Sequence, residues 1–117
     1  MKKYLILIAL FAFVLNSCEK NSWPVVFKAN ITYKVTGTAN EYWIQYVDEH
    51  GNYKQTGVKT SWTYEFKAKP EKYLYLSAKN NTGTGNVKVE IIQGQKVLFS
   101  AKNDLPFGVA TVSGFVK

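Results

Sequence analysis

Apolar and polar residues alternate with a period of two between Ile31 and Val116, and no segment keeps helical spacing over three turns. The clearest stretch is 62–67, in which aromatic residues alternate with threonine, glutamate and lysine. Such alternation is typical of strands with one buried face and one solvated face. Turn-forming residues recur about every 8 to 12 positions, which is the spacing of a sandwich or barrel. The sequence therefore predicts an all-β domain without a helix of consequence.

Eight strands can be placed between these turns. The third is polar and is expected at a sheet edge, and Pro70 ends the fourth because proline donates no hydrogen bond to a neighbouring strand. Seven to eight antiparallel strands in a domain of this length predict an immunoglobulin-like antiparallel β-sandwich. The expected strands are residues 25–36, 42–47, 53–58, 62–67, 73–79, 87–91, 96–101 and 109–116.

The first residues have the order of an export signal. Met1-Lys2-Lys3 is followed by an apolar stretch of 12 residues at 4–15, and the small residue Ser17 precedes Cys18. A bilayer needs about 20 apolar residues to be crossed, so the stretch is too short to span one. Cys18 is the only cysteine, so the chain holds no disulfide partner for it. This pattern resembles bacterial lipoproteins and predicts a removed leader at 1–17 and lipidation of Cys18.

Lipidation would hold a small domain close to a membrane. Removing the first 17 of 117 residues leaves 100, divided into a tether at 18–24 and one domain at 25–117. Two or more acyl chains anchor effectively permanently, since each buried methylene contributes about 0.8 kcal/mol. Residues 19–24 reach at most about 20 Å. We expect a protein of the bacterial cell envelope, periplasmic or at the cell surface; an ordinary signal peptide with a chance cysteine and an uncleaved anchor are the alternatives.

The basic residues argue against nucleic acid as a partner. All 15 are lysines, and the net charge of +7 becomes +5 when Lys2 and Lys3 leave with the leader. Bidentate recognition of phosphates and guanine edges relies on arginine, which the chain lacks. Lysines along strands usually protect sheet edges, and mild attraction to anionic lipid head groups is compatible with them.

Five short segments follow one another in a specific order. They are Tyr33-Lys34-Val35-Thr36-Gly37-Thr38-Ala39; Gln45-Tyr46-Val47-Asp48 running to Gly51; Ser61-Trp62; Tyr75-Leu76-Ser77-Ala78-Lys79-Asn80; and Gly83-Thr84-Gly85 before Val87-Lys88-Val89. In their order and spacing these segments resemble the extracytoplasmic domain of the MmpS family over roughly residues 31–114. The resemblance implies a small β-sandwich at a membrane face that assists MmpL-type transporters of the RND class, which move lipids or siderophores. It brings no catalytic residues, and the family's usual transmembrane helix is replaced here by the Cys18 pattern.

The sequence offers little catalytic or metal-binding chemistry. His50 is the only histidine, so a Cys/His pair with an acylated Cys18 and a zinc site with two His or Cys ligands are both excluded. The turn at 48–52 lacks the alternating oxygen ligands of a calcium loop, and 83–85 lacks the lysine of a phosphate loop. A glycosidase carboxylate pair stays open, although a sandwich of this size rarely encloses the necessary cleft. Its candidates are Glu41, Glu65, Glu71 and Glu90. We expect no enzyme activity, cofactor or metal.

Outward-facing aromatic residues are the best candidates for binding. Alternation that buries Leu74 turns Tyr73 and Tyr75 outward, and alternation that buries Ile44 turns Trp43 outward. Trp43, Tyr73 and Tyr75 thus form a candidate surface for protein, lipid or glycan. Large side chains on a sheet face also serve cross-strand packing, which is the alternative. Two functions follow: an accessory module of an envelope transporter, or a surface lipoprotein that binds glycan or host protein through these rings.

Overall fold

The computed structural model describes residues 27–117. The expected leader at 1–17, the lipidation of Cys18 and the tether at 18–24 lie outside the described residues, as do the first two positions of the expected first strand. The described range thus corresponds to nearly all of the domain expected at 25–117.

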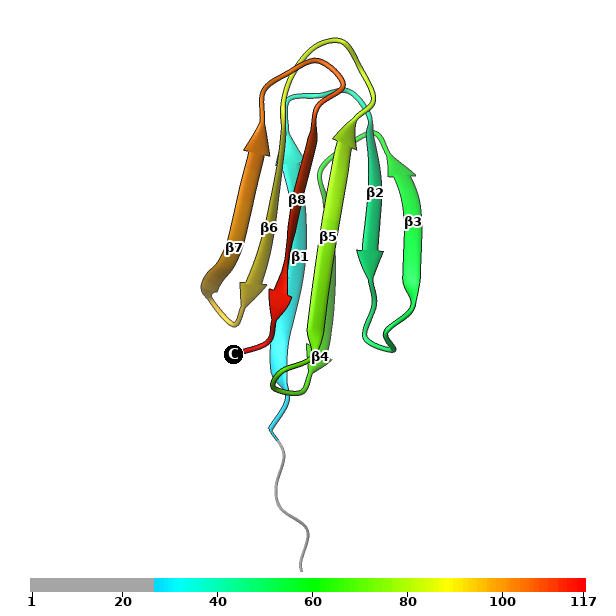
Figure 1. Cartoon of the computed structure of the whole chain (residues 1–117). Coiled ribbons are helices and arrows are strands. Elements are labelled where there is room, and N and C mark those ends of the chain that lie inside the picture. Colours follow the sequence, from blue (N-terminus) through cyan, green and yellow to red (C-terminus); the bar gives the residue numbers. More distant parts are fainter. Residues whose placement is uncertain (1–26) are drawn as a thin grey trace, which may run out of the picture.

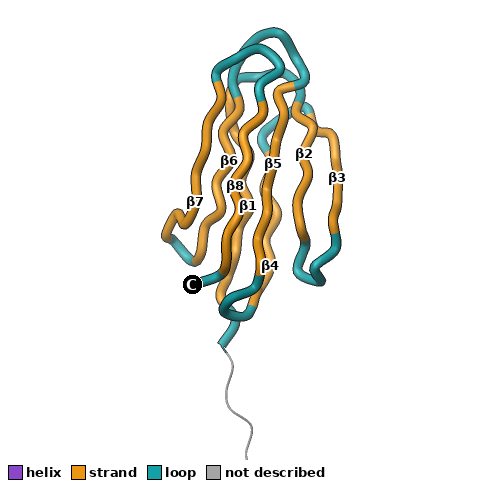
Figure 2. Tube along the Cα trace, viewed as in Figure 1, coloured by secondary structure: helices purple, strands orange, loops and turns teal. Residues whose placement is uncertain are grey.

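Residues 27–117 form eight β-strands and no helix, which confirms the all-β prediction (Figures 1 and 2). Within this range, accordingly, no helix is long and apolar enough to cross a bilayer. The first strand begins later than expected, at Ala29, because Phe27 and Lys28 pair with no neighbouring strand and are exposed. The strands are β1 (Ala29–Gly37), β2 (Tyr42–Val47), β3 (Tyr53–Val58), β4 (Trp62–Ala68), β5 (Tyr73–Asn80), β6 (Val87–Gln93), β7 (Lys96–Asn103) and β8 (Val109–Phe115).

The strands form two antiparallel four-stranded sheets that face each other (Figure 1). One sheet has the order β4-β1-β6-β7 and the other has the order β3-β2-β5-β8. The polar strand β3 lies at a sheet edge, as its composition predicts. The β-sandwich prediction is therefore confirmed.

The strand order differs from that of an immunoglobulin domain. In an immunoglobulin sheet the first strand of the chain lies at an edge and pairs with the second strand. Here β1 is a central strand between β4 and β6, and β2 belongs to the opposite sheet. The place beside β1 is taken by β6, which arrives late in the chain. The immunoglobulin-like detail of the prediction is thus not confirmed.

The two ends of the sandwich carry different connections (Figure 2). We call the end at which the chain enters through Phe27 and Lys28 the proximal end; it also holds the β2–β3, β4–β5 and β6–β7 turns. The distal end holds the connections at residues 38–41, 59–61, 81–86 and 104–108. The amide of Gly94 in the β6–β7 turn donates to the carbonyl oxygen of Asn30 at 2.8 Å. This bond ties the β6–β7 turn to the start of β1.

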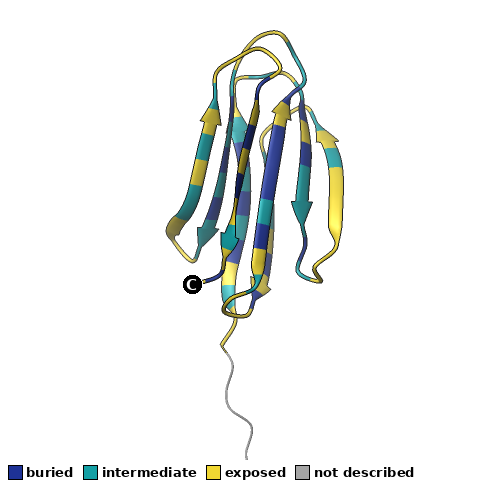
Figure 3. Cartoon of the chain, viewed as in Figure 1, coloured by how far each residue is buried: buried dark blue, intermediate teal, exposed yellow. Residues whose placement is uncertain are grey.

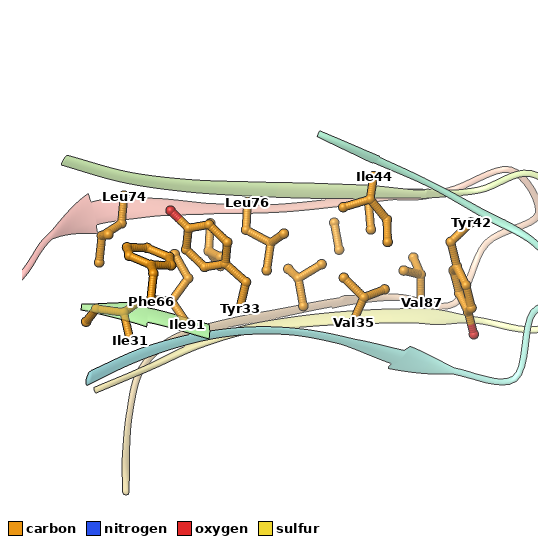
Figure 4. Close-up of a cluster of buried hydrophobic side chains, with 14 of the residues drawn as sticks. Ile31, Tyr33, Val35, Tyr42, Ile44, Phe66, Leu74, Leu76, Val87 and Ile91 are labelled. Atoms are coloured by element: carbon orange, nitrogen blue, oxygen red, sulfur yellow. The ribbon is translucent and has the colours of Figure 1, made fainter. Parts of the chain in front are cut away.

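The inward faces of the two sheets form one apolar core (Figures 3 and 4). Alternate residues along each strand point into it, which is how two packed sheets bury their facing sides. In β4 the expected inward set is confirmed: Phe66 is buried, whereas Trp62 and Tyr64 are half-buried because β4 is an edge strand. The buried apolar residues are Ile31, Tyr33, Val35, Tyr42, Ile44, Phe66, Ala68, Leu74, Leu76, Ala78, Val87, Val89, Ile91, Ala110, Val112 and Val116.

Tyr33 links the two sheets from the middle of this core. Its side chain is fully buried, and its hydroxyl donates to the carbonyl oxygen of Val47 in the opposite sheet at 2.6 Å. Its ring stands edge-on to Phe66, with 5.1 Å between ring centroids. Burial raises the pKa of the Tyr33 hydroxyl far above its ordinary value. The hydroxyl therefore stays protonated and remains a donor.

Asn80 organises the distal connection at 81–86. Its side chain is fully buried, and its Nδ2 donates to the carbonyl oxygen of Thr84 at 2.9 Å. Its Oδ1 accepts from the backbone amide of Thr82 at 2.8 Å. One buried amide thus satisfies polar backbone groups of a loop that folds around it.

Candidate binding surface

The outer face of the β3-β2-β5-β8 sheet carries exposed aromatic side chains. Tyr73 is 45% exposed and Trp43 is 38% exposed, while Tyr75 is half-buried. They point outward because their neighbours Leu74 and Ile44 are fully buried on the core side. The prediction that these three rings face outward is confirmed. In the part of the chain that the structure describes, the outer face of the opposite sheet carries no aromatic side chain.

Two of the three predicted rings belong to a larger group. We call Tyr53, Tyr73, Tyr75 and Phe115 the ring cluster. Tyr73 lies opposite Phe115 across the β5–β8 ladder, with 5.8 Å between ring centroids, and Tyr53 lies 6.2 Å from Tyr75. Tyr73 and Tyr75 stand two positions apart on one strand, roughly 7 Å. The cluster lies at the proximal end, because β3 and β5 begin there and β8 ends there.

Trp43 does not join the ring cluster. It pairs with Lys79 on β5, four positions from Tyr75, which corresponds to roughly 13 Å along the strand. On its other side Trp43 pairs with Gly57, where a Cβ, if present, would lie 3.4 Å from the indole ring. The indole thus covers the bare backbone of the edge strand β3, which is the packing role considered as the alternative. The structure therefore divides the predicted three-ring surface into the tyrosine pair and a separate tryptophan.

Tyr53 and Phe115 were missed as members of the surface. A sequence signal existed for Phe115, since the inward positions Ala110 and Val112 leave the odd-numbered residues of that strand outside. The sequence gives no such signal for Tyr53. The residues around it in the first half of β3 are all exposed, so no buried neighbour marks an inward face. Neither residue could be assigned to the cluster without the pairing of β5 with β8 and of β2 with both β3 and β5.

A second apolar surface lies at the distal end. Leu105 and Phe107 are 66% and 55% exposed, and Val109 beside them is 49% exposed. Pro106 and Phe107 occupy the centre of a turn in which the Gly108 amide donates to the Leu105 carbonyl oxygen at 3.0 Å. Phe107 has a positive φ of 55°, which is uncommon for an aromatic residue. The sequence indicated only a loop here.

The β2–β3 turn is held by its own acidic residues. Asp48 is buried, and its Oδ1 accepts from the backbone amides of His50 at 2.9 Å and Asn52 at 2.8 Å. The Glu49 carboxylate accepts from the Tyr64 hydroxyl, and this bond lowers the pKa of Glu49. The interpretation of 48–52 as a hairpin turn is confirmed. Among residues 27–117 no group of three His, Cys, Asp or Glu side chains is placed to hold a metal ion.

Acidification should weaken this turn through Asp48. Burial alone would raise the pKa of the Asp48 carboxyl, but the backbone amides of Asn52 and His50, with Lys54, lower it below its usual 3.8. A carboxyl whose pKa is lowered by folding stabilises the fold above the unfolded-state value, and this contribution is lost as the pH falls through the folded-state value. We expect wild type to lose stability below about pH 5 more steeply than Asp48→Asn, whose amide oxygen can accept the same bonds without titrating. Thermal unfolding across that range checks this, and parallel profiles would contradict it.

The carboxylates considered for a glycosidase pair are dispersed over the fold. Glu41 precedes β2 at the distal end, whereas Glu71 lies in the proximal β4–β5 turn. Glu65 and Glu90 lie on the outer face of one sheet, on the two strands that flank β1. Glu90 is instead paired with Lys88 at 3.8 Å. The structure thus keeps Glu41 and Glu71 at opposite ends of the sandwich, and it places Glu65 and Glu90 on either side of β1 on one outer face.

No protein family matches the chain, and no curated protein matches it. The resemblance to the MmpS family therefore stays a prediction that depends on its five segments.

Proposed function

We propose that this chain is a lipid-anchored, non-catalytic binding module of the bacterial cell envelope. The observation that carries the proposal is the distance along the chain between the Cys18 pattern and the sandwich. Since β1 begins at Ala29, only residues 19–28 separate the lipidated cysteine from the folded domain. Ten extended residues reach at most about 35 Å. A tether of this length keeps the domain at the membrane surface.

The preferred form of this function is an MmpS-like accessory role. The five MmpS-like segments support it, because in their order and spacing they are spread over roughly residues 31–114, nearly the whole sandwich. In this role the module would assist an RND-type, MmpL-like transporter, and its partner would be a membrane protein of the same envelope. The change from a transmembrane helix to a lipid anchor leaves the sandwich itself as the part that contacts the transporter.

A second candidate function is favoured by the ring cluster. Four neighbouring rings on one face resemble the aromatic-rich centres of binding surfaces. In this form the chain would be a surface lipoprotein that binds glycan or host protein. Two experiments separate these functions. Cross-linking in the native envelope that gives adducts with an RND transporter favours the first. Protease treatment of intact cells that cleaves the domain favours the second.

The anchor itself is tested at Cys18. Mass spectrometry of the mature protein should find residues 1–17 removed and acyl chains on Cys18, and the protein should sediment with membranes. In Cys18→Ser the acylated form should disappear, because serine supplies no thiol for the thioether. Ser22→Ala, which changes a hydroxyl just beyond the cysteine, serves as the control and should keep the lipid. A bare thiol or an intact leader in the wild-type protein would overturn the proposal.

A further inference from the structure

Positive charge is concentrated at the proximal end. Seven of the 12 lysines among residues 27–117 lie there, against the three carboxylates of Asp48, Glu49 and Glu71. The proximal end thus carries a net charge of +4, and the middle of the strands, with Lys34, Glu65 and Glu90, carries −1. The distal end has four lysines against Glu41 and Asp104, a net charge of +2. One end of the sandwich is therefore the more basic.

Four of the proximal lysines surround one open hollow between the start of β1 and the end of β4. Its lining residues include Lys28, Lys67, Lys69 and Lys72, with Glu49 as the single carboxylate. The first three of these lysines are exposed. The Glu49 carboxylate already accepts a hydrogen bond from the Tyr64 hydroxyl. Among the side-chain ion pairs of residues 27–117, none involves these four ammonium groups.

Aromatic side chains border the same end. Tyr73 and Phe115, which pair within the ring cluster, are both exposed; Tyr73 follows Lys72 in the sequence, and Phe115 lies two positions before Lys117. Phe27 is 80% exposed where the chain enters. Aromatic rings combined with lysines are the side chains that settle at a membrane–water interface, the rings at head-group level and the ammonium groups against anionic lipid. The apolar residues of the distal end lie beside a smaller positive charge, a net +2 against +4 at the proximal end.

We propose that the proximal end docks directly onto the anionic head groups of the membrane that holds the lipid anchor. This inference rests on the proposed function, since Phe27 and Lys28, which follow the tether in the sequence, precede β1 at this end of the sandwich (Figure 1). Lys28, Lys67 and Lys69 face the head groups, and Tyr73 and Phe115 enter the interface at the same end from the opposite sheet. The distal end, with Leu105 and Phe107, is then held away from the membrane by the length of the strands. A transporter would then meet that end, as in the preferred form of the function.

The test uses the full-length, lipidated protein reconstituted in vesicles of phosphatidylglycerol and phosphatidylethanolamine. A photoreactive phenylalanine analogue replaces Phe115 at the proximal end or Phe107 at the distal end, two positions of nearly equal exposure, 58% and 55%. Lipid adducts should form at position 115 at least tenfold more often than at position 107. Vesicles of phosphatidylcholine alone should reduce this ratio, as should about 1 M salt, at which the Debye length is ~3 Å.

Charge reversal supplies a matched pair of variants. Lys67→Glu with Lys69→Glu alters the proximal end, and Lys59→Glu with Lys79→Glu makes the same change at the distal end; all four lysines are exposed. A lysine near an anionic surface changes binding about fivefold. The proximal double variant should therefore lower the adduct yield at position 115 at least tenfold, whereas the distal one should leave it unchanged.

The outcomes separate this inference from the proposed function. Loss of flotation with vesicles overturns the anchor and the docking that depends on it. Flotation with equal adduct yields at positions 115 and 107 leaves the anchor intact and overturns the docking. Equal effects of the two charge reversals, or adducts at position 115 with a protein in place of lipid in native membranes, also overturn it. Circular dichroism of each variant establishes that the sandwich is folded.

Discussion

Replacing Tyr33 by alanine should lower the free energy of unfolding by about 4 kcal/mol, because it removes a fully buried ring from the middle of the core. The ring contacts aromatic neighbours from two other strands: Phe66, Tyr64 and Tyr46 lie 5.1, 6.3 and 6.0 Å away between centroids. Alanine would also remove the hydroxyl that donates to Val47 across the sandwich. Domains of this size are stable by about 5–15 kcal/mol, so the loss is a large fraction of the total.

Two further variants separate the contribution of the Tyr33 hydroxyl from that of its ring, and compare a buried ring with an exposed one. Tyr33→Phe keeps the ring and removes only the hydroxyl, which donates to the Val47 carbonyl oxygen and accepts from the Tyr75 amide at 3.4 Å, so it should cost about 1 kcal/mol. Tyr53→Ala removes a ring that is 53% exposed and should cost less than about 1 kcal/mol. Urea unfolding followed by circular dichroism measures all three, with an unchanged slope as the sign that compactness is preserved. A Tyr33→Ala loss no larger than that of Tyr53→Ala would contradict the central role of this side chain.

Local pattern was sufficient for the faces of the strands. In β4 and β5 the sequence alternation gave the correct inward and outward sets, because the side-chain period of a strand is fixed by its backbone. Pro70 and the turn residues at 48–52 located strand ends for the same local reason, whereas β6 and β7 each run two residues past their expected ends. These features depend on residues that are neighbours in sequence.

Pairing between strands could not be obtained in this way. The hydrogen bonds that place β6 beside β1 join residues about 50 or more positions apart, as in Gly37↔Val87 at the nearest. Membership of the ring cluster depends on the same kind of pairing, because Tyr73 meets Phe115 only through the β5–β8 register. Trp43 faced outward as expected, but its packing over Gly57 depends on the β2–β3 register. The site was therefore predicted in its residue types and faces, and not in its grouping.

At the distal end two connections are hydrogen-bonded to each other. At the distal end the backbone amide of Thr38 donates to the carbonyl oxygen of Asn86 at 3.2 Å, and the Asn86 amide donates to the Thr38 hydroxyl at 3.1 Å. These bonds hold the connection at 38–41 against the connection at 81–86. A surface that presents Leu105 and Phe107 to a partner would thus rest on a fixed base, which limits the conformational entropy lost on binding.

Gly85→Ala should test this close approach with the second large effect, a loss of about 3 kcal/mol in the free energy of unfolding. Gly85 has φ of +85°, and a Cβ there would lie 2.7 Å from the backbone nitrogen and Cα of Ala39. Backbone atoms cannot move aside as a flexible side chain can, so the two distal connections would have to separate. The expected loss of stability therefore combines the strain of an alanine in a left-handed backbone conformation with a steric clash against Ala39.

Gly94→Ala is the matched control, because Gly94 also has a positive φ, +65°, but a Cβ there would meet no atom within 4 Å. This variant should lower the free energy of unfolding by only about 1 kcal/mol, the cost of placing an alanine in a left-handed conformation. The difference between the two variants isolates the contact between the 38–41 and 81–86 connections, and chemical denaturation measures it. Hydrogen exchange should show faster exchange at the amides of Thr38 and Ala39 in Gly85→Ala alone, since both donate to Asn86. Equal losses of stability in the two variants would mean that the distal connections are free to separate and that the distal end is not a fixed base.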